Sequence, residues 1–245
     1  MNTKIPSSVF DKIKLISLDI WGTLILSNPE FKTHQLTLFT DYLNINDSEK
    51  LKNIVKQVDQ IADRLSLITE KDIDFDKRIQ KISQKTGNKS ILSEEKLHEL
   101  YSKMEVIFLE NLPLFIENDL PETLEEIRKK GLQICLLSNT GFIKGSTMKL
   151  ALKKLGIYSL IDFSVFSNET GYAKPSPFIF RELSLKTNLE PNEILHIGDN
   201  YDADYTGAKK VKFRALHFNK DIEKFNNFVY TTSIHRISSL LNFFE

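Results

Sequence analysis

Residues 13–24, IKLISLDIWGTL, are the stretch that decides the fold. The run Ile13 to Ile20 is apolar and rich in β-branched residues, and Gly22-Thr23 follows it, so it predicts a buried strand that runs into a turn. Three later segments have the same form, a short apolar run followed at once by a polar loop, at residues 132–137, 163–166 and 194–197.

Helical patterns separate these strands. They cover residues 121–130, 145–155 and 177–187, and the first has Pro121 in its opening turn and Gly131 as its stop. Strands that alternate with helices of about ten to fifteen residues imply parallel βαβ units. The prediction is an α/β fold with a doubly wound parallel sheet, completed by a weaker strand at 213–218 and a closing helix at 233–243.

The segment after the first strand breaks this alternation. Apolar residues at helical spacing occupy residues 50–68, 75–85 and 94–109, with no convincing strand between them. We therefore expect a core domain of residues 1–25 and 116–245 and a helical cap domain of residues 26–115. Because the insertion begins directly after the first strand's loop, the cap should lie over the carboxyl ends of the strands, where open α/β sheets bind ligands.

Composition narrows the class of protein. The 245 residues carry 33 Lys and Arg against 33 Asp and Glu, so no global field attracts nucleic acid or an anionic membrane. The N-terminal residues have no apolar signal region, and no run approaches the roughly 18 apolar residues of a membrane span. We expect a cytoplasmic protein with neither nucleic acid nor membrane as partner; the oligomeric state is not predicted. The single cysteine, Cys135, is expected in the core.

Polar residues follow each predicted strand at the same end. In a parallel sheet the loops there emerge on one edge, so their side chains should converge on Asp19, which closes the first strand. Clustered carboxylates raise each other's pKa unless a cation joins them, and hard oxygen ligands suit Mg²⁺. Lys174 would then bind an anionic group, and Ser138 would donate a hydrogen bond to it. The groups that should meet Asp19 are a hydroxyl from the segment Ser138-Asn139-Thr140, the Lys174 ammonium, and two or three of the carboxylates of Asp199, Asp202 and Asp204.

With these motifs in order, the chain resembles the haloacid dehalogenase superfamily of aspartate-nucleophile phosphohydrolases over nearly its whole length. The four matching segments are LDIWGTL at 18–24, LLSNTG at 136–141, AKPSPFIF at 173–180 and HIGDNYDADYTGA at 196–208. The insertion between the first two is similar to the helical cap of the subfamily whose cap occupies that position.

The resemblance implies a role for each matching residue. Asp19 would be the nucleophile and a Mg²⁺ ligand, and Ser138 and Lys174 would bind the transferring phosphoryl group. Thr23 and Asn139 would also contact the substrate, a small phosphorylated metabolite. The other metal contacts would be Asp199, Asp204 and the main-chain carbonyl of Trp21. Asp202 matches no motif role and is expected to be a solvated loop carboxylate.

Trp21 is a departure from the family pattern. Phosphatases of the family usually have a second aspartate there, which protonates the leaving group and then activates water. General acid or base catalysis contributes roughly 10²–10⁴ in rate, so its loss should restrict the enzyme to good leaving groups or require a substitute. His196 is a poor substitute, because it lies inside a strand and is expected in the core. His34, His98 and several acids of the cap are further candidates, and the sequence does not position them.

Two alternatives remain open beside the phosphatase. A 2-haloacid dehalogenase has an aromatic residue at the position of Trp21 and needs no metal, but this chain retains Asp199 and Asp204. Dehalogenases also use a cap arginine for the substrate carboxylate; the cap arginines here, Arg64 and Arg78, are both expected to be solvated. The other alternative is a non-catalytic module that binds Mg²⁺ and a phospho-ligand, although binding alone would not need Asp19.

Overall fold

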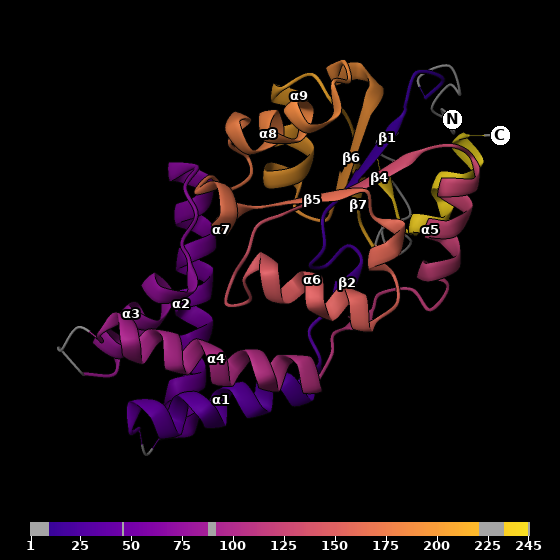
Figure 1. The fold of residues 1–245 in the computed structure, drawn as a ribbon. Helices are drawn as coiled ribbons and strands as arrows, with labels where there is room; N and C mark the ends of the chain where they lie inside the picture. Colours follow the sequence, from indigo (N-terminus) through magenta and orange to yellow (C-terminus); the bar gives the residue numbers. More distant parts are fainter. Residues whose placement is uncertain (1–9, 46, 88–91, 221–232, 245) are drawn as a thin grey trace, which may run out of the picture.

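A six-stranded sheet forms the centre of the computed structural model, which describes residues 10–45, 47–87, 92–220 and 233–244 (Figure 1). Its strand order is β5-β4-β1-β6-β7-β8, and every neighbouring pair is parallel. The predicted α/β class with a doubly wound parallel sheet is therefore confirmed. The strands are β1 (Leu15–Leu18), β4 (Gln133–Ser138), β5 (Phe163–Phe166), β6 (Ile194–Gly198), β7 (Arg214–Phe218) and β8 (Ser233–Ile234).

Helices cover both faces of the sheet. Helices α5 (Leu120–Lys129) and α6 (Gly145–Lys154) lie on one face, and α8 (Pro177–Thr187) and α9 (Gly207–Lys210) lie on the other (Figure 1). Successive strand residues point to opposite faces, so Leu15 packs with the α8 side and Ile16 with the α5 side. Cys135 is buried on the α8 side, and burial raises the pKa of its thiol. Its predicted place in the core is confirmed.

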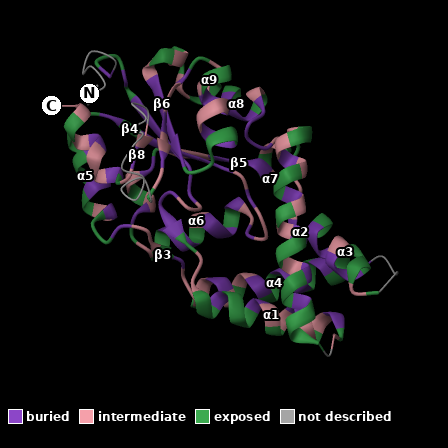
Figure 2. Cartoon of the chain, turned by 180° about the vertical axis from the view of Figure 1, so that it is seen from behind, coloured by how far each residue is buried: buried purple, intermediate pink, exposed green. Residues whose placement is uncertain are grey.

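The inserted segment is helical, as its periodicity predicts. Its described residues, 26–45, 47–87 and 92–115, hold four helices: α1 (Pro29–Leu43), α2 (Ser48–Thr69), α3 (Phe75–Lys85) and α4 (Glu94–Glu110). Figures 1 and 2 show them as a group set away from most of the sheet, with α2 reaching back toward the short helix α7 (Ser167–Thr170). Helix α1 was not predicted, although Asn28 caps its first turn and Pro29 follows as its first residue.

Two short strands flank these four helices. β2 (Ile25–Leu26) pairs antiparallel with β3 (Leu114–Phe115), so the chain enters and leaves the helical segment side by side. Two-residue strands are too short for periodicity to reveal, which is why none was predicted at the edges of the segment.

The predicted closing helix at 233–243 is wrong. Ser233–Ile234 instead adds the parallel strand β8 beside β7, and Ile237–Phe243 forms a 3₁₀ helix. Its apolar residues still reach the core, since Ile237 and Leu240 are fully buried. Burial was predictable, but the pattern does not distinguish a 3₁₀ turn after a strand from an α-helix.

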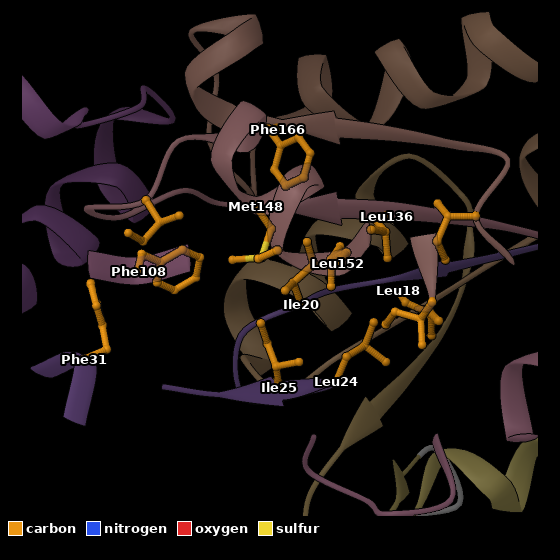
Figure 3. Close-up of a cluster of buried hydrophobic side chains, with 14 of the residues drawn as sticks. Leu18, Ile20, Leu24, Ile25, Phe31, Phe108, Leu136, Met148, Leu152 and Phe166 are labelled. Atoms are coloured by element: carbon orange, nitrogen blue, oxygen red, sulfur yellow. The ribbon is translucent and has the colours of Figure 1, made fainter. Parts of the chain in front are cut away.

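One apolar cluster continues from the sheet into the inserted helices. Figure 3 shows Ile20, Leu24 and Ile25 packed among core side chains, with Phe31 of α1 and Phe108 of α4 at its far side. The rings of Phe31 and Phe108 meet edge to face at 5.0 Å. The loop that follows β1 therefore forms part of the contact between the sheet and the helices.

No helix among the described residues is long and apolar enough to cross a membrane. Residues 1–9, on which the expectation of no signal region rests, lie outside the described part of the chain.

Candidate active site

Asp19 lies at the carboxyl edge of the sheet, one residue beyond β1. Its N–H donates to the Ile197 carbonyl at 2.9 Å, which extends the pairing with β6 past Leu18. Since β1 lies between β4 and β6, Asp19 emerges in the middle of the sheet edge with its side chain buried. Burial raises the pKa of this carboxyl, and the nearby Lys174 ammonium opposes that shift.

Lys174 joins two of the predicted acids. Its ammonium donates to Asp19 Oδ1 and to Asp204 Oδ1, both at 2.6 Å, and to the Leu137 carbonyl at 2.9 Å. The residue is 2% exposed, so all three protons of the ammonium have protein acceptors in a nearly dry site. Burial alone would lower its pKa, but the two carboxylates outweigh burial and raise the pKa above its ordinary value. The two carboxylates therefore favour the charged form of Lys174.

Asp204 is held from three sides. Besides Lys174, it accepts a hydrogen bond from His196 Nε2 at 3.0 Å and one from the Asn200 main-chain N–H at 3.0 Å. Burial opposes its ionisation, yet Lys174 and His196 hold the pKa of Asp204 well below its usual range. Burial lowers the pKa of His196, so the ring is neutral and Nε2 carries the proton.

The other ring nitrogen of His196 has a partner as well. His196 Nδ1 lies 2.9 Å from Ser17 Oγ, which donates to it when Nε2 is protonated. His196 is fully buried, as its position inside a strand predicts. Its hydrogen bond to Asp204 was not predicted, because an eight-residue separation across a loop gives no sequence signal.

A group of three carboxylates could hold a cation. Oxygens of Asp19, Asp199 and Asp204 lie within 4.8 Å of one another. Desolvation of its carboxylate, together with the charges of Asp19 and Asp204, raises the pKa of Asp199 to about 7. Three ionised carboxylates and one ammonium leave two negative charges unbalanced, which a divalent cation would neutralise. The donor set fits Mg²⁺, which prefers carboxylate oxygens.

Two glycines make this crowding possible. A Cβ placed on Gly198 would lie 2.2 Å from the Asp204 Cγ atom, and one on Gly22 would lie 2.3 Å from Asp199 Oδ2. Gly22 also has φ +75°, a conformation that other residues rarely adopt. Any side chain at either position would push a carboxylate out of the group.

The loop after β4 is tied to the loop that carries Lys174. The Asn139 side chain donates to the Lys174 carbonyl at 3.0 Å and accepts from the Lys174 main-chain N–H at 2.7 Å. Ser138 is buried, and its hydroxyl helps to lower the pKa of Asp19 by hydrogen bonding. Thr23 is also buried, and among the described residues its Oγ1 has no hydrogen-bond partner.

Asp202 and Trp21 lie apart from this hydrogen-bonded group. Asp202 lies in the π-helical turn Tyr201–Thr206 and is exposed, as predicted. Its main-chain N–H donates to the side chain of Asn200, which precedes the turn. Trp21 is half-buried, and its ring centroid lies 6.3 Å from that of Phe108 in α4. The indole therefore belongs to the apolar contact with the cap helices.

The expectation that both cap arginines are solvated is wrong for one of them. Arg64 is exposed on α2, as expected. Arg78 on α3 is 2% exposed and pairs with Asp59 and Asp63 of α2, while its Nε donates to the Ile73 carbonyl at 2.8 Å. Helical periodicity places Arg78 on a face but does not show which neighbouring helix covers that face.

The family model that describes haloacid dehalogenase-like hydrolases matches residues 13–212. The chain belongs to this family of hydrolases, as the motif resemblance implies. The human haloacid dehalogenase-like hydrolase domain-containing protein 3 is 36% identical over 90 residues, which cover 37% of this chain and 34% of that protein. The chain thus aligns with about a third of that relative's length.

A relative and a solved structure extend the comparison. The ribulose-1,5-bisphosphate 5-phosphatase of Halopiger xanaduensis is 31% identical over 106 residues, 43% of each chain. The crystal structure of a 2-haloacid dehalogenase from Pseudomonas syringae pv. Tomato DC3000 superposes with a TM-score of 0.64 at 19% identity, over 94% of this chain and 97% of that one. At that identity the structural likeness shows the fold alone.

The raised pKa of Asp199 predicts a pH-dependent effect of Mg²⁺ on stability. Without metal, the folded protein keeps a proton on Asp199 that the unfolded chain loses near pH 4, so this contribution to stability is lost as the pH rises toward 7. Mg²⁺ binds the ionised group, so its stabilising effect should grow between pH 6 and 8. Thermal unfolding in chelator and in Mg²⁺ measures both trends.

Asp199→Asn should remove both trends, with the exposed Asp202→Asn as the matched control. An Asp199→Asn protein whose pH profile and response to Mg²⁺ equal those of the parent would contradict the assignment of Asp199.

Proposed function

We propose that the protein is a Mg²⁺-dependent phosphatase that hydrolyses phosphate esters of small molecules through an aspartyl-phosphate on Asp19. The observation that carries this proposal is the buried ammonium of Lys174 between Asp19 and Asp204, beside the third carboxylate of Asp199. Such a site offers a nucleophile, a fixed cation and a place for a divalent metal. The similarity to a relative named as a sugar-bisphosphate phosphatase supports this choice.

Asp19 would attack the phosphorus atom with one carboxylate oxygen, while the bond to the ester oxygen breaks. Lys174 already donates to Asp19 Oδ1, so the ammonium keeps the carboxylate oriented and lies within reach of the transferring group. Water would then attack the phosphorus atom of the aspartyl-phosphate, releasing inorganic phosphate and restoring the Asp19 carboxylate. The hydroxyl of Ser138 and the groups of Asn139 and Thr23 would bind the phosphoryl oxygens.

Asp19, Asp199, Asp204 and the main-chain carbonyl of Trp21 would hold Mg²⁺, which supplies charge neutralisation for the phosphoryl group. Helices α1 to α4 would act as a cap domain of residues 26–115 over a core domain of residues 1–25 and 116–245. That cap would admit the substrate and then exclude water from the aspartyl-phosphate.

The dehalogenase alternative is less well supported by the site. The guanidinium of Arg78 is occupied by Asp59, Asp63 and a main-chain carbonyl. A reaction without metal would also leave Lys174 as the one ammonium beside the three acids Asp19, Asp199 and Asp204. The binding-module alternative does not account for a buried carboxylate oriented at the strand end, since phosphate binding favours cations and neutral donors there.

Asp19→Asn should abolish hydrolysis of an aryl phosphate, because an amide is a poor nucleophile and removes one charge from the metal site. The parent protein should need Mg²⁺ for the same reaction. Phosphate release in chelator and in Mg²⁺, with Asp202→Asn as control, tests both points. Undiminished turnover by Asp19→Asn would reject the proposed nucleophile, and chloride release from a 2-haloacid in chelator would favour the dehalogenase.

Because Trp21 stands where a proton donor is expected, the rate of hydrolysis should fall steeply as the leaving group becomes more basic. Without a dedicated proton donor, aryl phosphates should react much faster than alkyl phosphates. Trp21→Asp should raise the rate for alkyl esters by about 10–10³, less than a full general-acid contribution, because the new side chain replaces an indole that packs near Phe108. Initial rates on a series of esters with different leaving groups measure this effect.

Trp21→Phe is the control and should leave both substrates nearly unchanged, since it keeps an aromatic ring near Phe108. If Trp21→Phe loses turnover while a folded Trp21→Asp shows no gain for alkyl esters, the indole itself takes part in binding and the leaving-group account is wrong.

A further inference from the structure

One segment of the inserted helices touches the core far from the β2–β3 connection. Residues 70–72, between α2 and α3, lie antiparallel to residues 171–173: Ala173 N–H donates to the Glu70 carbonyl at 3.1 Å, and Asp72 N–H donates to the Gly171 carbonyl at 3.2 Å. Figures 1 and 2 both show the end of α2 beside α7. We call residues 70–72 the cap strap. Its first residue, Glu70, is bonded to Ala173, the residue that precedes Lys174.

The Asp72 side chain extends this contact into the core. Its Oδ1 accepts a hydrogen bond from Ser167 Oγ at 2.6 Å, and Ser167 Oγ in turn accepts from the Thr140 main-chain N–H at 2.7 Å. Asp72 is 7% exposed, Ser167 is fully buried, and Thr140 is buried as well. The direction of both hydrogen bonds is fixed. An ionised carboxylate only accepts hydrogen bonds, so the Ser167 hydroxyl donates to Asp72 and a lone pair of the same oxygen accepts from the Thr140 N–H.

Thr140 ends the segment that carries the proposed phosphoryl-binding groups Ser138 and Asn139. Asn139 is bonded in both directions to the main chain of Lys174. The cap strap thus holds the 172–174 loop through its main chain and the 138–140 loop through Asp72 and Ser167. Both loops of the proposed site depend on one segment of the cap.

A buried carboxylate has a large desolvation cost at this contact. Burial raises the pKa of Asp72, the Ser167 hydrogen bond and the nearby Arg78 oppose that shift, and among the described residues its second oxygen has no hydrogen-bond partner. An apolar side chain would pack there without that cost. A charge-assisted hydrogen bond, in contrast, fixes the Ser167 hydroxyl more firmly than a neutral partner would.

We propose that Asp72 is a positioning residue, which orders the 138–140 loop through Ser167 and so makes phosphoryl binding depend on the docked position of the cap. This inference rests on the proposed phosphatase function for its effect on turnover. The ordering of the loop itself can be measured without turnover.

The experiment compares Asp72→Ala, Asp72→Asn and Ser167→Ala in the full chain. Hydrogen exchange of the Thr140 amide should accelerate about tenfold in Asp72→Ala, and binding of inorganic phosphate in the presence of Mg²⁺ should weaken by a similar factor. Asp72→Asn retains an oxygen that accepts from Ser167, so its effect should be smaller. With an aryl phosphate, KM should rise more than kcat falls, and Asp76→Asn, an exposed acid of α3, should change none of these quantities.

A double variant tests the route through Ser167. If Asp72 acts through that hydroxyl, Asp72→Ala combined with Ser167→Ala should bind phosphate no more weakly than Ser167→Ala alone. Additive losses would overturn the proposal, as would a folded Asp72→Ala whose Thr140 exchange and phosphate affinity stay within about twofold of the parent. Hydrogen exchange and phosphate binding do not need catalysis. These results therefore remain valid even if the turnover of Asp19→Asn contradicts the proposed phosphatase function.

Discussion

The structure of the site depends on one buried cation. The Lys174 ammonium lies between Asp19 and Asp204, which could not share a dry strand edge in ionised form without it. The same ammonium also donates to the Leu137 carbonyl at the end of β4. Strands β1 and β4 and the loop after β6 are therefore connected by one side chain. Removing its charge would disturb the proposed nucleophile and the proposed metal site together.

Two positions without a Cβ atom and one buried histidine also determine where the carboxylates lie. Asp204 can approach Lys174 only because residue 198 has no Cβ, and Asp199 can approach the loop after β1 only because residue 22 has none. His196 then fixes the orientation of Asp204 from inside β6, with Ser17 of β1 fixing the imidazole tautomer. The neutral histidine adds a hydrogen bond without adding a second positive charge, so the site keeps the negative charge that a divalent cation would neutralise.

The sequence predicted the parts that follow from alternation and strand ends. Apolar runs and intervening helices predict the parallel sheet, and the loops at its carboxyl edge predict that Asp19, Lys174 and Asp204 meet. It did not predict the burial of Arg78 or the bonds of Asp72 and His196. Those contacts join elements far apart in the chain, and neither a helical face nor a strand position identifies the partner across a tertiary contact.

Trp21 and Asp72 connect the inserted helices with the proposed site in two different ways. At residue 21, the proton donor that the family resemblance leads one to expect is replaced by an indole near Phe108 of α4, so a position close to the proposed nucleophile serves the contact with the inserted helices. At residue 72, a cap carboxylate reaches the loop that carries Ser138. Both features bind the inserted helices to the site. The proposed phosphatase, without a dedicated acid, would depend more on excluding water and on holding the phosphoryl group still, and docked inserted helices would provide both.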